Sequence, residues 1–479
     1  MAIVRVLLAF CVVCSLAGAA HASSAPVRGF EQSFRHGREL AMFSDDDRSS
    51  FGFIMQAIIR FLGAEKDNGQ YVSVARVRLA RPMSPGGTFT RGGYTVHADV
   101  LSFAVANLAV GLRKYAAGFQ NASVYSSSFA FLESSANYID NNMWQRRSTD
   151  KLFMHQVGDS TGHQLQWGLS YGDLRGLPAD QLRPVLELNN TSPAIAFDVS
   201  SGMAATSKLL GTTPRLRFIK HAGEMLTYGA MTPLSYSAGR AVFGDEMVFA
   251  AIHRAYAENT IGSPLREWPG KAAIGDMRVH PIIFSRSEKS LGCLVLLSMD
   301  WFKDYYRTRD NFAGQASNWF TAILAGRQGV RFTSGGLIYV PGHSNVHGSL
   351  HVAVFTALAS YLYVDFGMDN QTSLQAQQLV RFADTQIAYI MGQNPLGRCY
   401  VYGISANSVT KLYHRFAYNP SSWILLPTLS GALVGGPLDG TDAFIDDGSN
   451  PVANGVSVDS AVALLICLAR QLWAAAQSR

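Results

Sequence analysis

The stretch GALVGGPLDGTDAFIDDGSNPVANGVSVDSAVALLICLARQLW, residues 431–473, joins a loop rich in glycine and aspartate to a long apolar segment. From about residue 459 to 476, hydrophobic side chains recur at the three- and four-residue spacing of an α-helix. Asp459 stands at the start of this segment, where an aspartate is well suited to cap a helix. The stretch therefore predicts an acidic loop that leads into a buried helix.

The same helical pattern recurs along the chain, whereas strand-like alternation is sparse. Loops rich in glycine, proline and aromatic residues separate the helices, and none of them resembles a flexible linker. Such a series is typical of a helical toroid that forms one domain, rather than of a parallel sheet. The other helices are expected at about 51–63, 100–118, 124–142, 199–210, 214–229, 245–258, 290–306, 314–325, 346–366 and 372–392.

Composition supports a globular protein with a large core, because 48% of the 479 residues are hydrophobic and 11% are aromatic. The net charge of +6 is spread along the chain without a block of lysine or arginine, so no nucleic-acid partner is expected. Beyond the first residues, Cys293, Cys399 and Cys467 lie far apart. This spacing excludes a disulfide framework or a zinc cluster, and leaves open one disulfide or three buried thiols.

The N-terminus has the features of a targeting segment. Arg5 precedes an apolar run that ends in the small residues Ala20 to Ala22. The run is shorter than the roughly 20 residues that span a membrane, so an uncleaved signal anchor is the lesser alternative. We predict a signal peptide at 1–22 and a single mature domain at 23–479, secreted and without stable membrane insertion.

Two short motifs have both a chemical and a plain structural interpretation. GLSYG, residues 168–172, matches the nucleophile elbow of serine hydrolases, but the polar residues after it favour an ordinary loop. His343, His347 and His351 are spaced four apart, so they would share one face of a helix and could bind a metal. Gly348 weakens that helix and no carboxylate lies within it, so ordinary histidines are favoured and no metal site is predicted.

Carboxylates and aromatic rings form a third set of candidates. Cleavage of a glycosidic bond generally uses two carboxyl groups, one as acid and one as base or nucleophile. Asp99 follows a glycine-rich stretch, Trp167 and Trp423 stand in predicted loops, and further aspartates gather near the C-terminus. Acidic loop residues also form caps and turns, so composition alone leaves sugar cleavage undecided.

The order and spacing of six motifs resemble glycoside hydrolase family 9, the cellulase-type endoglucanases, over most of the chain. The resemblance implies an all-α fold, an (α/α)6 barrel made of two rings of helices, which agrees with the helices expected from periodicity. It also implies an inverting mechanism on β-1,4-glucan, in which an aspartate activates water and a glutamate protonates the leaving oxygen. The motifs are RGGYTVHADVLSF (91–103), LFMHQVGDSTGHQLQWG (152–168), GGLIYVPGHSNVHGSLHVAVFTALASYL (335–362), YIMGQNPLGRCYVYG (389–403), KLYHRFAYNPSSW (411–423) and GALVGGPLDGTDAFIDDGSN (431–450).

Matched to the family's motifs, several site residues remain and others differ. The base is Asp99, but its water-positioning partner is replaced by Val96. Trp167 keeps its place, whereas the histidine three residues before it becomes Gln164. The resemblance also assigns substrate contacts to four retained residues, Trp167, His414, Arg415 and Asp446.

The family's acid glutamate falls at Gly455, which cannot donate a proton. A general acid typically supplies about 10²–10⁴-fold in rate, so weak activity is expected. Asp447 and Asp459 are the nearby carboxyl groups that could substitute for it. Their ordinary interpretations are a loop residue that points away and a helix cap.

Two functions from different classes follow, so whether the chain is an enzyme stays open here. One is a weakly active glycosidase of the endoglucanase class, and the other is an inactive pseudoenzyme that binds a glycan. Both imply a polysaccharide partner, expected to be a β-glucan. No cofactor is expected, because the structural calcium of the family would need a glutamate that does not follow Asp198.

Overall fold

The computed structural model describes residues 43, 45–66, 87–93, 95–146, 151–157, 185–187, 193–231, 244–258, 283–299, 306–415 and 429–477. The predicted signal peptide and the GLSYG motif lie outside these ranges. The predicted boundary between the signal peptide and the mature domain therefore stays a prediction.

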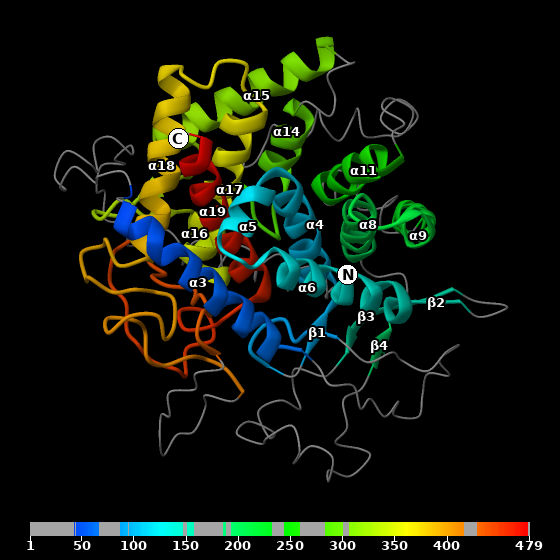
Figure 1. Ribbon diagram of the computed structural model, residues 1–479, viewed down its shortest axis with the longest axis horizontal. Helices are drawn as coiled ribbons and strands as arrows, with labels where there is room; N and C mark the ends of the chain where they lie inside the picture. Colours follow the sequence, from blue (N-terminus) through cyan, green and yellow to red (C-terminus); the bar gives the residue numbers. More distant parts are fainter. Residues whose placement is uncertain are drawn as a thin grey trace, which may run out of the picture.

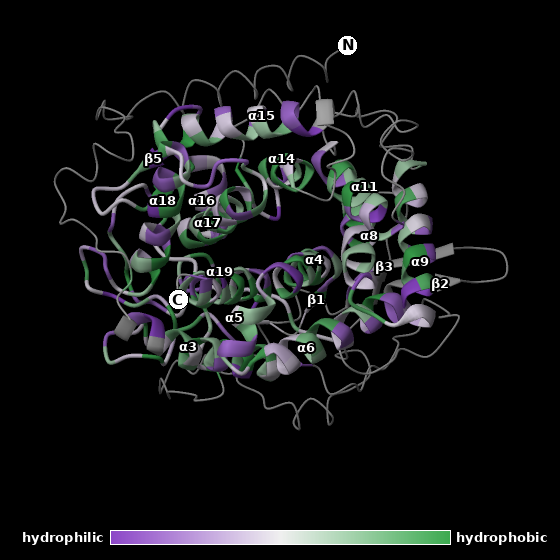
Figure 2. Cartoon of the chain, turned by 45° about the horizontal axis from the view of Figure 1, so that its top comes forward, coloured by the Kyte–Doolittle hydropathy of each residue, from purple (hydrophilic) through white to green (hydrophobic). Residues whose placement is uncertain are grey.

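Six helices pack side by side into a closed inner ring (Figures 1 and 2). Each packs on the next in chain order, and the last returns to the first. α17 and α19 are buried along most of their length, as expected for helices that are apolar on all sides. The inner helices are α4 (Ala98–Lys114), α8 (Pro193–Ser207), α11 (Gly244–Glu258), α14 (Ser290–Ser298), α17 (Ser349–Phe366) and α19 (Val458–Gln477).

A second layer of helices lies outside this ring, and each packs on an inner neighbour. α18 illustrates why they form: Ser373 caps its first turn by accepting from the Ala376 N–H at 3.2 Å, and its buried residues recur on one face. The double ring agrees with the (α/α)6 barrel. The outer helices are α3 (Asp45–Ala64), α6 (Tyr125–Tyr138), α9 (Thr212–Ala230), α15 (Tyr306–Leu324) and α18 (Leu374–Ile390), with the short α5 (Ala116–Asn121), α16 (Pro341–His347) and π-helical η1 (Ile139–Met143) between elements.

Several predicted helices differ from the observed ones. α8 begins at Pro193 instead of 199 and α15 at Tyr306 instead of 314, and three other segments are divided or shortened. The segment 100–118 is divided between α4 and α5 at Tyr115, and the segment 290–306 ends as α14 at Ser298. The segment 346–366 is broken at Gly348, whose φ of 88° is outside helical geometry. A Cβ there would lie 2.3 Å from the carbonyl oxygen of Gly435, so only glycine allows these two segments of the chain to approach this closely.

A small antiparallel sheet lies beside the ring and fixes where α4 begins. β1 (Val96–His97) pairs with β3 (Lys151–Val157), and β3 also pairs with β2 (Trp144–Arg146) and β4 (Val185–Glu187). Because β1 runs directly into α4, the sheet holds the first turn of that helix in place. A separate hairpin consists of β5 (Arg331–Phe332) and β6 (Ile338–Tyr339).

Four phenylalanines fill the barrel interior between α4, α11, α17 and the segment before α14. The Phe103 ring lies 5.0 Å from that of Phe355 and 5.5 Å from that of Phe284, and Phe249 packs against the same group. Such contacts between aromatic rings stabilise a core beyond the burial of their area. Phe103 lies one helical turn after Asp99, so this aromatic layer forms the floor beneath the polar residues described next.

Two described helices, α17 and α19, are long and apolar enough to cross a membrane. Both belong to the inner ring, and 89% and 78% of their apolar windows are buried inside the protein. Their composition is thus accounted for by the barrel core. Cys293, Cys399 and Cys467 are buried free thiols, so of the two alternatives, one disulfide or three buried thiols, the structure has the second.

Candidate functional site at the N-terminal ends of the inner helices

The inner helices present their N-terminal ends to the same end of the barrel, which we call the mouth. Asp99 is the second residue of α4 and Asp459 is the second residue of α19. Arg286, four residues before α14, joins them: its Nε lies 3.8 Å from an Asp99 oxygen and its Nη1 lies 3.3 Å from an Asp459 oxygen. One guanidinium therefore connects three inner helices at the mouth.

The charges at the mouth keep both aspartates ionised. Burial raises the pKa of Asp99, but Arg286 and Arg91 outweigh it and hold the pKa below its usual value. Burial likewise opposes ionisation of Asp459, and Arg286 and the neighbouring polar groups again lower its pKa. Asp99 is about a quarter exposed, so it can reach a water molecule, whereas Asp459 is fully buried. Asp99 thus has the properties of the predicted base.

A cavity of about 120 Å³ opens beside this charge cluster. Its walls come from the loop before α4, the segment before α14, the α16–α17 junction and the loop before α19. Gly455, the position matched to the family's acid, is part of the wall. Its lining includes Arg91, Arg286, His347, His351, Gly455 and Ser460.

Gly455 has no room for a side chain. A Cβ built there would lie 2.0 Å from the carbonyl oxygen of Pro451, far inside contact distance. Its backbone is also held, because Gly455 forms a β-bridge with Tyr413. Any larger residue would have to displace this backbone, so the loop is built around glycine at this position.

Neither predicted substitute has the properties of a proton donor. Asp447 is exposed at a turn, where the backbone N–H and the hydroxyl of Ser449 donate to its carboxylate and lower its pKa. Asp459 also has a lowered pKa. A catalytic acid needs the opposite shift, so that it carries a proton near neutral pH. Both residues are therefore structural carboxylates in this protein.

The acidic loop holds the barrel end together. Asp442 is buried and accepts hydrogen bonds from Thr333, Ser334 and Tyr389 at 2.5–2.8 Å, which connects the β5–β6 hairpin to α18. Asp446, predicted to contact substrate, accepts from the backbone N–H and the hydroxyl of Thr410, each at 2.8 Å. The aspartates of this loop therefore serve to form turns and to accept hydrogen bonds that connect separate segments.

His414 and Arg415 do not line the described cavity. Both are fully buried, and they bind the two carboxylate oxygens of Glu65 at 2.7 Å each. The Arg415 guanidinium also donates to the Gly93 carbonyl oxygen at 3.0 Å, in the loop that leads to Asp99. The expectation of direct substrate contact is replaced by support for that loop, because a buried arginine must be paired.

The remaining predicted positions are Val96, Trp167 and Gln164. Val96 is fully buried in β1 and offers no polar group to position water. Trp167 and Gln164 lie outside the described residues. Sequence reasoning did not single out Arg286 or Glu65, because a lone charged residue in a loop or after a helix carries no motif.

The residues around Asp198 do not fit the calcium that the family resemblance raised. The Lys289 ammonium lies 3.3 Å from Asp198 and 3.4 Å from Glu246, with all three side chains largely buried. Burial also raises the pKa of Asp198 to about 7, which weakens it as a metal ligand. Calcium requires about six to eight oxygen ligands, and here a lysine supplies the positive charge instead.

The three histidines do not share a helix face, because Gly348 separates α16 from α17. Their Nδ1 atoms contact three different partners: Ser287 for His343, Arg286 for His347 and Ser460 for His351. Within the described ranges there is no group of three or more His, Cys, Asp or Glu that could hold a metal ion.

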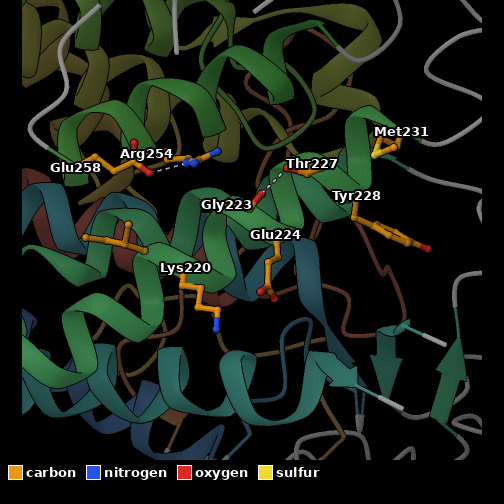
Figure 3. A pocket seen from close by; sticks show the side chains of 9 residues that line it. Lys220, Gly223, Glu224, Thr227, Tyr228, Met231, Arg254 and Glu258 are labelled. Atoms are coloured by element: carbon orange, nitrogen blue, oxygen red, sulfur yellow. Dashed lines mark hydrogen bonds and ion pairs between the residues drawn. The ribbon is translucent and has the colours of Figure 1, made fainter. Parts of the chain in front are cut away.

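A larger depression, about 450 Å³, lies between α9 and α11 (Figure 3). Arg254 and Glu258 line it from the C-terminal part of α11, and its other lining residues lie on α9 or at Met231 directly after it. The Arg254 and Glu258 side chains pair with each other at 2.8 Å. Asp99, Asp459 and Arg286 are not among its lining residues. The depression therefore has no share in the carboxylate chemistry of the mouth.

The double ring of helices places the chain in the (α/α)6 barrel class. Ionised aspartates lie at the N-terminal ends of two of its inner helices, α4 and α19. The chain belongs to glycosyl hydrolase family 9, whose sequence model matches residues 85–468. Among solved structures, the endoglucanase of the termite Nasutitermes takasagoensis superposes with a TM-score of 0.71 at 21% identity, over 89% of this chain and 99% of that one. This similarity confirms the predicted fold.

Curated relatives that the chain matches are endoglucanases, and two of them are longer than this chain. Endoglucanase 13 of Oryza sativa subsp. japonica is 26% identical over 62% of this chain and 53% of its own length. Endoglucanase B of Cellulomonas fimi is 25% identical over 80% of this chain and 37% of its own length. The chain thus spans about half or less of these two relatives.

Proposed function

We propose that this protein binds a β-1,4-linked glucan at the mouth of the barrel and hydrolyses it slowly, with Asp99 as the base. The observation that carries the proposal is the ionised, partly exposed carboxylate of Asp99 beside the cavity. Family membership supports a sugar substrate, and a structurally similar Clostridium thermocellum endoglucanase, CelQ, was solved in complex with cellotriose.

In an inverting hydrolysis, the base takes a proton from the water that attacks the anomeric carbon. Asp99 is suited to this step because Arg286 holds it in the carboxylate form and the first turn of α4 fixes its position. The leaving oxygen must receive a proton from elsewhere. With Gly455 at the acid position, solvent is the proton source in this proposal, at a rate cost of about 10²–10⁴-fold.

The second candidate is a pseudoenzyme that binds the glycan without cleaving it. The observation that favours it is the backbone packing at Gly455, where no side chain fits. Val96 is also buried and apolar, so its side chain cannot orient the attacking water. The two candidates differ in whether Asp99 still acts as a base.

An activated aryl glycoside separates them. The 2,4-dinitrophenolate of 2,4-dinitrophenyl β-cellobioside departs without protonation, so its hydrolysis needs a base but no acid. We expect release of dinitrophenolate by the mature protein, residues 23–479, and at least about 100-fold less by Asp99→Asn, since a general base contributes about 10²–10⁴-fold. Reducing-sugar release from soluble β-1,4-glucan, measured in parallel, should be detectable but slow.

The matched control is Asp447→Asn, which removes an exposed carboxylate from a turn of the acidic loop and should leave both rates unchanged. Equal dinitrophenolate release by the wild type and Asp99→Asn would refute the base assignment. If cello-oligosaccharides nevertheless bind, that outcome would favour the pseudoenzyme.

We further propose that the protein is secreted, which rests on the leader pattern at 1–22. N-terminal sequencing of the protein from the medium of a secreting host tests this. A mature N-terminus near residue 23 is expected, whereas a chain that keeps its leader on the membrane would support the anchor alternative.

A further inference from the structure

The cavity beside Gly455 is lined by side chains that donate hydrogen bonds. Arg286 has five N–H donors and contacts Asp99, Asp459 and His347 with its three nitrogens, which leaves N–H groups for a ligand. Arg91 contributes a second guanidinium to the same wall. Arginine is the side chain best suited to bind carboxylate or sulfate groups, because its planar fork can make two parallel bonds.

The histidines extend this donor set. An Arg286 nitrogen lies 3.2 Å from His347 Nδ1, and because arginine can only donate, that ring nitrogen must accept. Burial lowers the pKa of His347 to about 3, so the ring is neutral and carries its single proton on Nε2. His347 therefore offers a donor from the cavity wall.

His351 has an unfilled position for a ligand. Its side chain is only 3% exposed, and its Nδ1 contacts the Ser460 hydroxyl at 2.8 Å. Its Nε2 is buried without a hydrogen-bond partner. A buried polar atom without a partner costs free energy, and a ligand hydroxyl in this cavity would satisfy it. This is a second observation, independent of the arginines, that a polar ligand belongs here.

We infer that this cavity binds the carboxylate of an acidic sugar, so that the glycan bound by the protein carries hexuronic acid residues. The inference rests on the proposed function, since it names the substrate class of the same site. A hexuronic acid presents a carboxylate for Arg91 and Arg286, and its ring hydroxyls match the open position on His351. A volume of about 120 Å³ holds several waters or one sugar carboxylate, but not a chain of sugars.

The charge at the mouth is consistent with one added carboxylate. Asp459 is fully buried behind Arg286, so Arg286 screens it from the cavity. Asp99 contacts Arg286 through Nε, whereas the His347 contact uses another nitrogen of the same guanidinium. The cavity is thus lined by the two arginines, whereas neither Asp99 nor Asp459 is among its lining residues.

The test compares two oligosaccharides that differ only at carbon 6. Binding of cellotetraose and of a β-1,4-linked glucuronic acid tetramer to the mature protein would be measured by isothermal titration calorimetry at low salt. We expect the acidic tetramer to bind at least about tenfold more tightly, the gain typical of one charge-assisted hydrogen bond. Raising the salt to 0.5 M should reduce this preference, because the contact is ionic and partly exposed.

Arg91→Gln is the test variant, because the Arg91 side chain is exposed and its loss should leave the barrel folded. It should abolish the preference for the acidic tetramer, so that the ratio of the two affinities, measured on the same variant, falls to about one. Arg327→Gln, at an exposed arginine after α15, is the matched control and should behave as the wild type. Thermal unfolding would verify that both variants keep the fold.

Three outcomes would overturn the inference. Equal affinity for the two tetramers would refute the acidic substrate, while glucan binding and cleavage that depends on Asp99 would leave the proposed function intact. A preference that survives in Arg91→Gln would place the anion elsewhere. Inorganic sulfate that binds as tightly as the acidic tetramer, with the same dependence on Arg91, would assign the cavity to a free oxyanion instead of a sugar acid.

Discussion

Replacing Glu65 with glutamine should strongly destabilise the barrel, because this carboxylate neutralises a fully buried arginine. Glu65, His414 and Arg415 are each 0% exposed, and the two ion contacts measure 2.7 Å. Removing one partner of a buried ion pair typically costs about 3–5 kcal/mol, because the other charge stays buried without compensation. The contact of the Arg415 guanidinium with the Phe89 ring, 4.3 Å from its centroid, remains and keeps the expected loss within this range.

The pH dependence of stability provides a second measure of the same pair. Burial raises the pKa of Glu65, but Arg415 and His414 together lower it by more than burial raises it, so the folded pKa lies below the usual 4.5. A group with a depressed folded pKa contributes stability above its unfolded pKa, and this contribution is lost as the pH falls through the folded value. The difference between wild type and Glu65→Gln should therefore be complete at neutral pH and shrink below about pH 4.5.

Guanidinium unfolding of the mature protein, followed by tryptophan fluorescence, would measure these differences. Asp447→Asn serves as the control, since changes at exposed positions usually stay within about 0.5 kcal/mol. The double variant Glu65→Leu/Arg415→Met should regain much of the lost stability, because it leaves no unpaired charge. A loss below about 1 kcal/mol for Glu65→Gln at pH 7 would refute the account of a buried charge cluster.

Three further outcomes are expected. Gly455→Glu should fail to restore glucan hydrolysis and should cost about 1–3 kcal/mol, because its Cβ meets the Pro451 carbonyl; a 100-fold gain in reducing-sugar release at unchanged thermal stability would contradict this. Arg286→Gln should raise the pKa of Asp99, because the guanidinium that lowers it is removed, and so move the acid limb of the dinitrophenyl-cellobioside pH–rate profile to higher pH; an acid limb that stays in place would show that Arg286 does not control the base. The three buried cysteines should react with a thiol reagent only after unfolding, since burial raises their pKa; labelling of the native protein within minutes would be inconsistent with the packed core.

Helical periodicity predicted the barrel because its inner helices are apolar on every side and its outer helices on one side. The pattern failed where backbone geometry, not side-chain polarity, ends a helix. Gly348 is the clearest case, because hydrophobic residues continue on both sides of it while its φ of 88° breaks the helix. Similarly, a run from 290 to 306 does not continue as one helix beyond Ser298.

For the site, the motif order located Asp99 and the glycine at the acid position, since both depend on local sequence. The partners of these residues come from distant parts of the chain and carry no local signal. Arg286 lies 187 residues after Asp99 yet contacts it at 3.8 Å. His414 and Arg415 show the same limit: their motif predicts substrate contact and carries no sign of Glu65, about 350 residues away, with which both are paired in the interior.

Two cations in one short segment, residues 286–289, contact three carboxylates of the inner helices. The N-terminal ends of the inner helices carry partial positive charge and favour acidic side chains, and Asp99 and Asp459 lie in the first turns of α4 and α19, while Asp198 is the sixth residue of α8. These carboxylates would repel one another in a buried site, and the cations that contact them, Arg286 and Lys289, both precede α14. Arg286 and Lys289 contact these carboxylates directly, and Gly455 takes no part in those contacts. The ionic framework of the mouth therefore does not depend on a side chain at position 455.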